Sequence, residues 1–320
     1  MKNVKRTISA IILCGTLCLS GCGGAENEPE TTTEPLAETT VEATVETTAE
    51  TTVESKVARI VEVPYEGGTA VFEFNEKDLL VAEKNRPWGG SNKHYTYDKE
   101  NRITEISYAN YDGTVDEYCE RVTYEYNVDG KIKKINVYNL QENILVRYFE
   151  YEYEDGLLTK IDAYQRNQGK YVKTYSDEYY YNEKGLKIRS RNVADDGSYG
   201  ENFYTYDDKG RLILEEYSQG AGSTEYVYDE SGKIIKEVHG IDEMELVYEY
   251  ENGVLAKTVW VKDEFNSEQY SNEGSYTEYK YYDNGNIVAR YHCDKNGEIG
   301  EINIDAIPEV KGNYSDDMNV

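Results

Sequence analysis

The side chains that most often carry catalysis are few and scattered in this 320-residue chain. The three histidines, His94, His239 and His292, have no partners at the spacings of metal sites or nucleophilic triads, and the chain has no GxSxG or P-loop motif. A glycoside hydrolase needs only two carboxylates at a set separation, but among 62 acidic residues such pairs arise by chance. We therefore expect no catalytic residues, no bound metal and no cofactor, with glycan hydrolysis by a carboxylate pair as the alternative.

Three acid-rich segments carry the hard oxygen ligands that Ca²⁺ prefers. They are Asn110–Glu117, Ala194–Glu201 and Asp294–Asp305. Asp-Gly and Asn-Gly steps are also the usual residues of tight hairpin turns, because both tolerate a positive φ. We interpret all three segments as structural turns.

Tyrosine, in contrast, recurs in a fixed local pattern. The chain has 33 tyrosines against five phenylalanines, and many occur in pairs of the form Y-x-Y. Seven of the eight pairs are followed directly by an acidic or amide residue, and the eighth by Tyr282 and then Asp283; glycine or asparagine comes shortly after, as in YTYDDKGRL and YEYENGVL. Such repetition exceeds what composition alone would give and predicts an internal structural repeat. The eight pairs begin at Tyr95, Tyr124, Tyr151, Tyr179, Tyr204, Tyr226, Tyr248 and Tyr279.

One copy has the pattern of a β-hairpin, as its fifth example shows. Tyr204 and Tyr206 lie on the same face of a strand, because side chains alternate along a strand. Asp207 opens a turn, Gly210 supplies the positive φ of a hairpin bulge, and Leu212 begins the return strand. We predict a structural role for these five residues.

A single two-stranded hairpin is marginal in water, so the copies must pair edge to edge. Rows of tyrosines across neighbouring strands then stabilise one cooperative sheet, with each cross-strand pair contributing about 0.2–1 kcal/mol. The predicted fold class is all-β: a meander of antiparallel hairpin repeats in an open curved or partly curled sheet.

The pattern Y-x-Y-D-x-x-G-R-L resembles the YD repeat of the RHS (rearrangement hotspot) family, over Tyr95 to about Asp294. In large relatives such repeats form a spiral β-shell around a toxin domain, and YD-type repeats are associated with carbohydrate binding. This chain has no Asp-Pro dipeptide for the autocleavage motif of those toxins, and no toxin domain follows the last copy. The resemblance implies the repeat architecture without the toxin function; an immunity-like or structural accessory of an RHS-type locus is a further alternative.

The connections between copies vary in length, whereas the segment from Y-x-Y to glycine hardly varies. One rim of the sheet therefore has uniform turns and the other has variable loops, which in repeat proteins often carry binding. The longest connection, Lys262–Ser275, follows Trp260 and contains Phe265 and Tyr270. We predict these three aromatic side chains to contact a carbohydrate or protein ligand.

The N-terminus carries Lys2, Lys5 and Arg6 and then an apolar run that is too short to span a bilayer, as in a secretory signal. The run ends in LSGC, which resembles the lipobox of bacterial lipoproteins. The resemblance implies that residues 1–21 are a lipoprotein signal peptide and that Cys22 becomes the lipidated first residue. It also implies an extracytoplasmic, surface-exposed chain that the lipid holds at the bacterial membrane.

Composition divides the rest of the chain. Residues 22–56 are rich in Thr and Glu, with a glutamate at every fourth position from 30 to 54, and predict a disordered stalk. We assign residues 57–94 to an N-terminal capping hairpin region, residues 95–294 to the eight repeats, and residues 295–320 to a C-terminal cap and tail.

Charge and cysteine content limit the partners. A net charge of −28 repels phosphate backbones, so no nucleic acid is expected. Cys119 and Cys293 are far apart in the sequence, and their spacing does not predict a disulfide. The sequence as a whole predicts a lipid-anchored, non-enzymatic β-repeat scaffold for binding or adhesion, with an envelope glycan hydrolase as the main alternative.

Overall fold

The computed structural model describes residues 56–87, 90–220, 222–240, 244–262 and 273–306, all within one compact unit. Four of the predicted features lie outside these residues: the signal peptide with Cys22, nearly all of the stalk, Phe265 with Tyr270, and the tail after Ala306. In the part of the chain that is described, no helix is both long enough and apolar enough to span a membrane.

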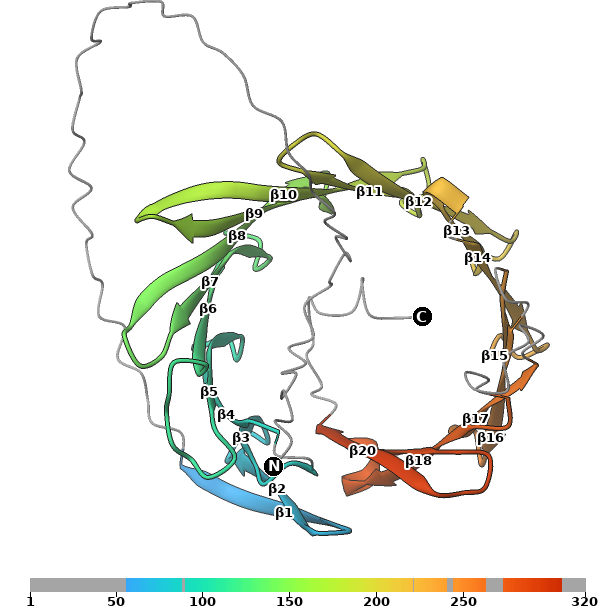
Figure 1. Ribbon diagram of the computed structural model, residues 1–320, viewed down its shortest axis with the longest axis horizontal. Helices are drawn as coiled ribbons and strands as arrows, with labels where there is room; N and C mark the ends of the chain where they lie inside the picture. The colour runs from blue at the N-terminus through green and yellow to red at the C-terminus, as the bar shows by residue number, and fades with distance from the viewer. Residues whose placement is uncertain (1–55, 88–89, 221, 241–243, 263–272, 307–320) are drawn as a thin grey trace, which may run out of the picture. The chain divides into compact units, whose positions relative to one another are not determined.

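The described chain forms one antiparallel sheet of twenty strands, in which each strand pairs with the next along the sequence. Within these residues β1 and β20 are each paired on one side only, so the sheet is open. This confirms the predicted all-β meander. Figure 1 shows the strands along an arc that brings the last hairpin back beside the first strands.

The strands are β1 (Val57–Tyr65), β2 (Gly68–Asn75), β3 (Leu80–Lys84), β4 (Asn92–Tyr97), β5 (Ile103–Ala109), β6 (Glu120–Tyr126), β7 (Ile132–Asn139), β8 (Ile144–Glu154), β9 (Leu157–Asn167), β10 (Lys170–Tyr181), β11 (Lys187–Ala194), β12 (Tyr199–Tyr206), β13 (Leu212–Tyr217), β14 (Gly222–Tyr228), β15 (Ile234–His239), β16 (Met244–Glu251), β17 (Val254–Lys262), β18 (Tyr276–Tyr282), β19 (Ile287–Cys293) and β20 (Ile299–Ala306).

In five of the eight copies the residue after the tyrosine pair caps the hairpin turn with its side chain: Asp98, Asn127, Asn182, Asp207 and Asp229. In the fifth copy, Asp207 Oδ1 accepts hydrogen bonds from the backbone N–H groups of Lys209 and Arg211, both at 2.9 Å. Gly210 has a φ of +81°, which a side chain with a Cβ rarely adopts. Asn101 takes the same place in the first copy with a φ of +64°, as asparagine tolerates this region better than most residues.

Every copy from the first to the seventh has a β-bulge just before its second tyrosine. In the fifth copy Thr205 pairs with Leu214, but Tyr206 pairs with Leu212, so Ile213 is the extra residue. The other six copies shift register at the same point. A bulge disrupts the local ladder of backbone hydrogen bonds and increases the twist of the strand pair.

The second tyrosine of one copy satisfies a backbone carbonyl at the bulge of the preceding hairpin. Tyr206 donates its hydroxyl hydrogen to the carbonyl of Lys187 at 2.7 Å, and Tyr228 donates to that of Leu212 at 2.7 Å. Because buried carbonyls need partners, this bond couples each repeat to the one before it. Seven copies share it, at 2.6–2.9 Å, through Tyr97, Tyr126, Tyr153, Tyr181, Tyr206, Tyr228 and Tyr250.

The basic residue after the turn couples the same neighbours a second way. The Arg211 guanidinium is paired with Asp207 and lies 4.5 Å from the ring centroid of Tyr228 in the next copy. Arg102 lies 4.4 Å from the ring centroid of Tyr126 in the same manner. Such cation–π contacts at partly exposed sites contribute about 0.5–1 kcal/mol each. The motif therefore specifies contacts between copies as well as the shape of one copy.

We call the sheet face that carries both tyrosines of each pair the tyrosine face. Directly paired residues of antiparallel strands share a face, so the cross-strand registers carry this face from β2 to β19. On the first strands it is largely buried, and it includes Phe72, Phe74 and Tyr95 together with the acid Glu83, which pairs directly with Phe72.

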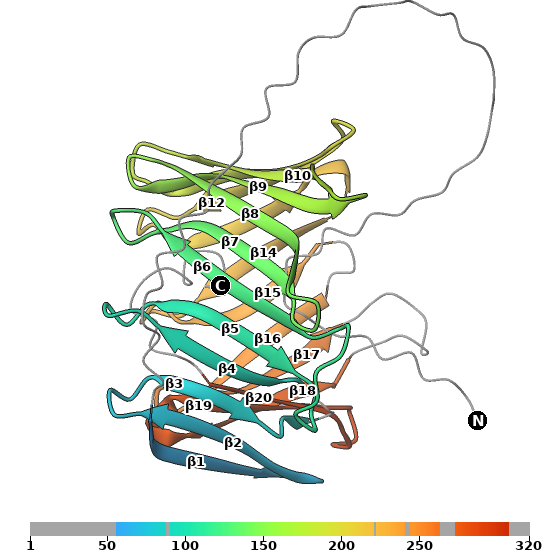
Figure 2. The ribbon, with the colours of Figure 1, turned by 90° about the vertical axis from the view of Figure 1, so that its left-hand side faces the viewer.

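The two ends of the sheet overlap face to face. The tyrosine face of β2–β5 packs in one core with Ile287, Ala289 and Tyr291, which lie on the opposite face of β19, because the tyrosine-face residues there are Val288 and Arg290. The ends thus contact each other as successive layers of a scroll do, without backbone pairing between β1 and β20 (Figure 2). Buried members of this core are Val63, Ala70, Phe72, Phe74, Leu80, Tyr95, Ile103, Ile106, Ile287, Ala289, Tyr291, Cys293, Ile302 and Ile304.

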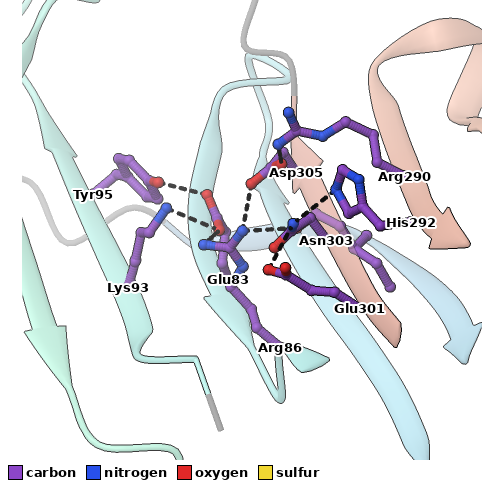
Figure 3. A network of polar contacts seen from close by, with 10 residues as sticks. Glu83, Arg86, Lys93, Tyr95, Arg290, His292, Glu301, Asn303 and Asp305 are labelled. Atoms are coloured by element: carbon purple, nitrogen blue, oxygen red, sulfur yellow. Dashed lines mark hydrogen bonds and ion pairs between the residues drawn. The ribbon is translucent and has the colours of Figure 1, made fainter. Parts of the chain in front are cut away.

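A polar network borders this overlap (Figure 3). Arg86, just after β3, donates to the carbonyl of Ile304 at 2.9 Å and pairs with Asp305, which also pairs with Arg290. Glu83 is only 3% exposed and accepts a hydrogen bond of 2.5 Å from the hydroxyl of Tyr95.

Arginine and lysine side chains hold the overlap and neutralise its buried acid. Arg86 Nη1 and Lys93 Nζ lie 3.5 and 3.3 Å from Glu83 Oε2. Arg59 on β1 forms two further ion pairs, with Asp78 at 2.6 Å and with Asp283 at 2.8 Å. Two arginines thus connect the first strands to the last hairpin.

Candidate functional site

The polarity of the tyrosine face changes along the array. The residue directly opposite the first tyrosine of each pair is isoleucine in the first three copies, namely Ile106, Ile135 and Ile161. From the fourth to the seventh copy it is Ser190, Glu215, Glu237 and Thr258. The same position is therefore apolar in the first three copies and polar in the next four, where Glu237 and Thr258 are buried as Ile106 is.

Glu237 on β15 is the most buried acid of this polar half, with 8% of the residue exposed. Tyr248 donates a short hydrogen bond to its Oε1, and His239 Nε2 lies 3.4 Å from its Oε2. Tyr226 is its direct cross-strand partner and donates to Glu215 Oε2 at 3.4 Å. Two carboxylates and two phenols thus alternate across three neighbouring hairpins.

The imidazole of His239 connects this acid to an indole. His239 Nδ1 lies 3.3 Å from Thr224 Oγ1, and its ring centroid lies 5.3 Å from that of Trp260 on β17. Trp260 is half-buried, and backbone bonds to Gly274 and Ser275 close the base of the long connection beside it. We call Glu215, Tyr226, Glu237, His239, Tyr248 and Trp260 the Glu237 cluster.

Both phenols of the Glu237 cluster are held protonated. Burial, and then the charge of Glu215, raises the pKa of Tyr226. Burial, and then the hydrogen bond to Glu237, raises the pKa of Tyr248. Each hydroxyl is therefore a hydrogen-bond donor at neutral pH.

Of the ligand residues predicted from the sequence, Trp260 is the one that the structure describes, and it lies in the Glu237 cluster. His94 and His292 lie elsewhere on the sheet: His292 contacts Thr277 and Asn303, close to the overlap. Sequence reasoning missed Glu237 and its neighbours. The available signal was the change from isoleucine to serine and glutamate at one position of the repeat.

The acid-rich segments form turns. In the first, Asp112 Oδ1 accepts from the backbone and hydroxyl of Thr114 at 2.9 and 2.6 Å. In the last, Asp294 Oδ1 accepts from the backbone N–H groups of Asn296 and Glu298, both at 2.8 Å. Among the described residues, no group of three or more His, Cys, Asp or Glu side chains is arranged to hold a metal ion.

A different aromatic group lies on the opposite face of β8–β10. The rings of Tyr148 and Tyr164 stack at 4.6 Å, and Tyr171 meets Tyr148 edge-on at 5.4 Å. Lys134 covers the Tyr148 ring at 4.0 Å. Because these rings mainly cover one another, we interpret the group as cross-strand packing.

The fold and the Glu237 cluster together define an open antiparallel sheet of tyrosine-pair hairpins with a polar, aromatic half. No protein-family model matches the chain, and no curated protein matches it. Among solved structures, the Tc holotoxin pore of Photorhabdus luminescens is similar over 72% of this chain, with 13% identity and a TM-score of 0.36.

Two further structures show comparable similarity. A TcdB2–TccC3 complex is 12% identical over 72% of this chain, with a TM-score of 0.36. A porin-like protein from Bacteroides uniformis is 11% identical over 65% of this chain and 91% of its own, with a TM-score of 0.35. The chain covers only 14% and 15% of the two toxin chains.

Proposed function

We propose that this chain is a lipid-anchored, non-enzymatic scaffold of the bacterial envelope, which binds a carbohydrate or other cell-wall ligand on the polar half of its tyrosine face. The Glu237 cluster is the observation that carries the binding proposal. An indole beside carboxylates and phenol donors is the combination that sugar recognition uses: an aromatic ring offers an apolar surface, and fixed polar groups orient the hydroxyls.

The anchoring part of the proposal rests on the sequence. The lipobox-like LSGC supplies Cys22 for lipidation, and the Thr- and Glu-rich residues 22–56 would lift the sheet away from the membrane. Two or three acyl chains give stable anchoring, since each buried methylene contributes about 0.8 kcal/mol. The tyrosine repeat is then the support for the ligand site.

Replacing Cys22 with serine should release the protein from the membrane fraction. The parent chain should sediment with membranes and carry a diacylglyceryl group on an N-terminal Cys22, as seen by intact-mass and peptide mass spectrometry. The Cys22→Ser chain should be found in the soluble extracytoplasmic fraction or keep its signal segment. An unmodified parent N-terminus would refute the anchor.

Removing the indole should abolish binding of cell-wall polysaccharide. In a pull-down of the full chain with purified wall glycans, we expect Trp260→Ala to lose most of the bound protein, because the stacking surface is gone. Phe203→Ala is the matched control: Phe203 is 40% exposed, and it pairs with Glu216 on the opposite face. Binding that survives Trp260→Ala, or that Phe203→Ala removes equally, would contradict this site.

One observation favours the alternative of glycan hydrolysis. Glu215 and Glu237 share the tyrosine face and are separated by the single strand β14. Strands two apart are about 10 Å from each other, and the two acids are staggered by two residues along them, so their side chains must lean together to reach the carboxylate separation of inverting glycosidases. Release of reducing ends from the same glycans by the parent chain, and its loss in Glu237→Gln, would favour hydrolysis over binding alone.

A further inference from the structure

Buried acids elsewhere on this sheet have basic partners. Glu83 faces Arg86 and Lys93, as described above, and Asp162 lies 2.9 Å from Lys160 Nζ and 2.6 Å from Lys173 Nζ. Burying a carboxylate without an opposite charge is costly, so this pairing is what physical chemistry requires.

Glu237 departs from this rule. Its side chain is 10% exposed, and its ion-pair partner in the described part of the chain is a histidine, without lysine or arginine. Glu215, across β14, likewise forms no ion pair with a lysine or arginine of the described strands. The Nε2 atom of His239, 3.4 Å from Glu237 Oε2, is buried and forms no hydrogen bond with the described residues. No lysine or arginine of the described residues therefore balances the carboxylates of the site.

Three aromatic side chains lie near this charge. Tyr226 is paired directly with Glu237, Tyr248 donates to it, and Trp260 lies beyond His239. The faces of such rings attract cations, most strongly for tryptophan, and a carboxylate with an aromatic enclosure is the arrangement that recognises organic ammonium groups. The net charge of −28 also raises the local concentration of cations and lowers that of anions.

We propose that the Glu237 cluster binds an organic ammonium group, with the carboxylate of Glu237 as its counter-ion and the surrounding aromatic rings as its enclosure. This inference deepens the proposed binding function by giving the charge of the ligand. A protonated amino sugar and a quaternary ammonium share the chemistry that the site recognises. A metal cation fits less well, because aromatic rings replace the oxygen ligands that hard cations need.

Titration of the full chain in mild detergent with two small probes tests the proposal. Glucosamine and choline, as chlorides, represent the two sources of the ammonium group, and glucose is the neutral control. We expect saturable binding of at least one ammonium probe, measured by calorimetry and by tryptophan fluorescence, and none of glucose at the same concentration. Which probe binds more tightly identifies the source.

Matched variants separate a specific site from general attraction to an acidic protein. Glu237→Gln keeps an acceptor for Tyr248 but removes the charge, so affinity for the ammonium probe should fall about tenfold or more. Glu249→Gln removes one charge from the neighbouring β16–β17 hairpin, at an exposed residue on the opposite face, and it should bind as the parent does. Trp260→Phe, which keeps an aromatic ring, should weaken binding less than Glu237→Gln.

The inference fails if neither probe binds saturably, or if Glu237→Gln binds as tightly as the parent. It also fails if Glu249→Gln loses as much affinity, because the attraction would then be non-specific. If the chain binds wall glycans through Trp260 but binds neither ammonium probe, the proposed function stands and this inference is wrong. Ammonium binding without glycan binding would do the reverse.

Discussion

Raising the pH from about 9 to about 12 is expected to unfold the sheet cooperatively, because its tyrosines must stay protonated to keep their bonds. Burial raises the pKa of Tyr126 to about 12, and it raises the pKa of Tyr97 and of Tyr228 as well. Each of these hydroxyls donates to a backbone carbonyl of the preceding hairpin. A phenolate cannot donate, and it would face a carbonyl oxygen instead.

The direction of this pH effect follows from the protonation of the phenols in the folded and in the unfolded chain. Below pH of about 10 the phenols are protonated in both the folded and the unfolded chain, so their contribution to stability is fully present. Above it the unfolded chain ionises first, and the free energy of unfolding falls by about 1.4 kcal/mol per pH unit for each phenol that stays protonated only in the folded chain. That contribution is lost as the pH rises through the folded pKa.

Ultraviolet absorbance of phenolate and circular dichroism, followed on the same sample, check this expectation. The loss of β-structure and the main rise of phenolate should coincide above pH of about 10. Two outcomes would contradict it: phenolate signal that is complete before any structural change, or native dichroism that persists after most tyrosines have ionised.

Removing Glu83 is expected to cost about 3–5 kcal/mol of unfolding free energy, because Arg86, Lys93 and the Tyr95 hydroxyl would lose a common buried partner. Glu83→Ala should lower the urea midpoint strongly, and the overlap of the sheet ends should loosen first. Hydrogen exchange of β3 and β20 should then accelerate before that of β8–β10.

Glu105→Ala provides the matched control. Glu105 is paired with Arg121 at 3.0 Å, but both side chains remain partly exposed, so the loss should be about 1 kcal/mol or less. Where Glu83→Ala does not fold, Glu83→Gln keeps an acceptor for Tyr95 and should still lose more stability than Glu105→Ala. Equal losses at the two positions would show that the buried network does not hold the ends.

The sequence predicts the hairpins well because their signals are local. Tyr204, Asp207 and Gly210 act within nine residues, through strand alternation, a turn-capping carboxylate and a positive φ. The position of the β-bulge cannot be predicted from such local signals. Leu212 and Ile213 are both aliphatic, and either could pair with Tyr206. Only the packing of the next tyrosine selects one of them.

The Glu237 cluster and the overlap cannot be predicted from local sequence signals either, because both depend on contacts between distant residues. Glu237 and Trp260 meet through the registers of β15, β16 and β17, and a shift of one residue would send either side chain to the other face. Arg86 and Asp305 are 219 residues apart, so their contact depends on the accumulated twist of every intervening strand pair. The sequence shows where the polar residues of the repeat lie, but it does not show which residues they contact in the folded sheet.

The overlap of the two ends has a consequence for how this array can change. A repeat adds two strands, or about 10 Å along the sheet, and each bulge adds its own increment of twist. Inserting or deleting one copy would therefore carry β19 and β20 past the partners they have on β1–β3. Arg59 would then lose Asp283, and Arg86 would lose Asp305 and the carbonyl of Ile304. The overlap therefore limits the number of repeats. Residues within the internal copies can be substituted, but the number of copies must place β19 and β20 against β1–β3.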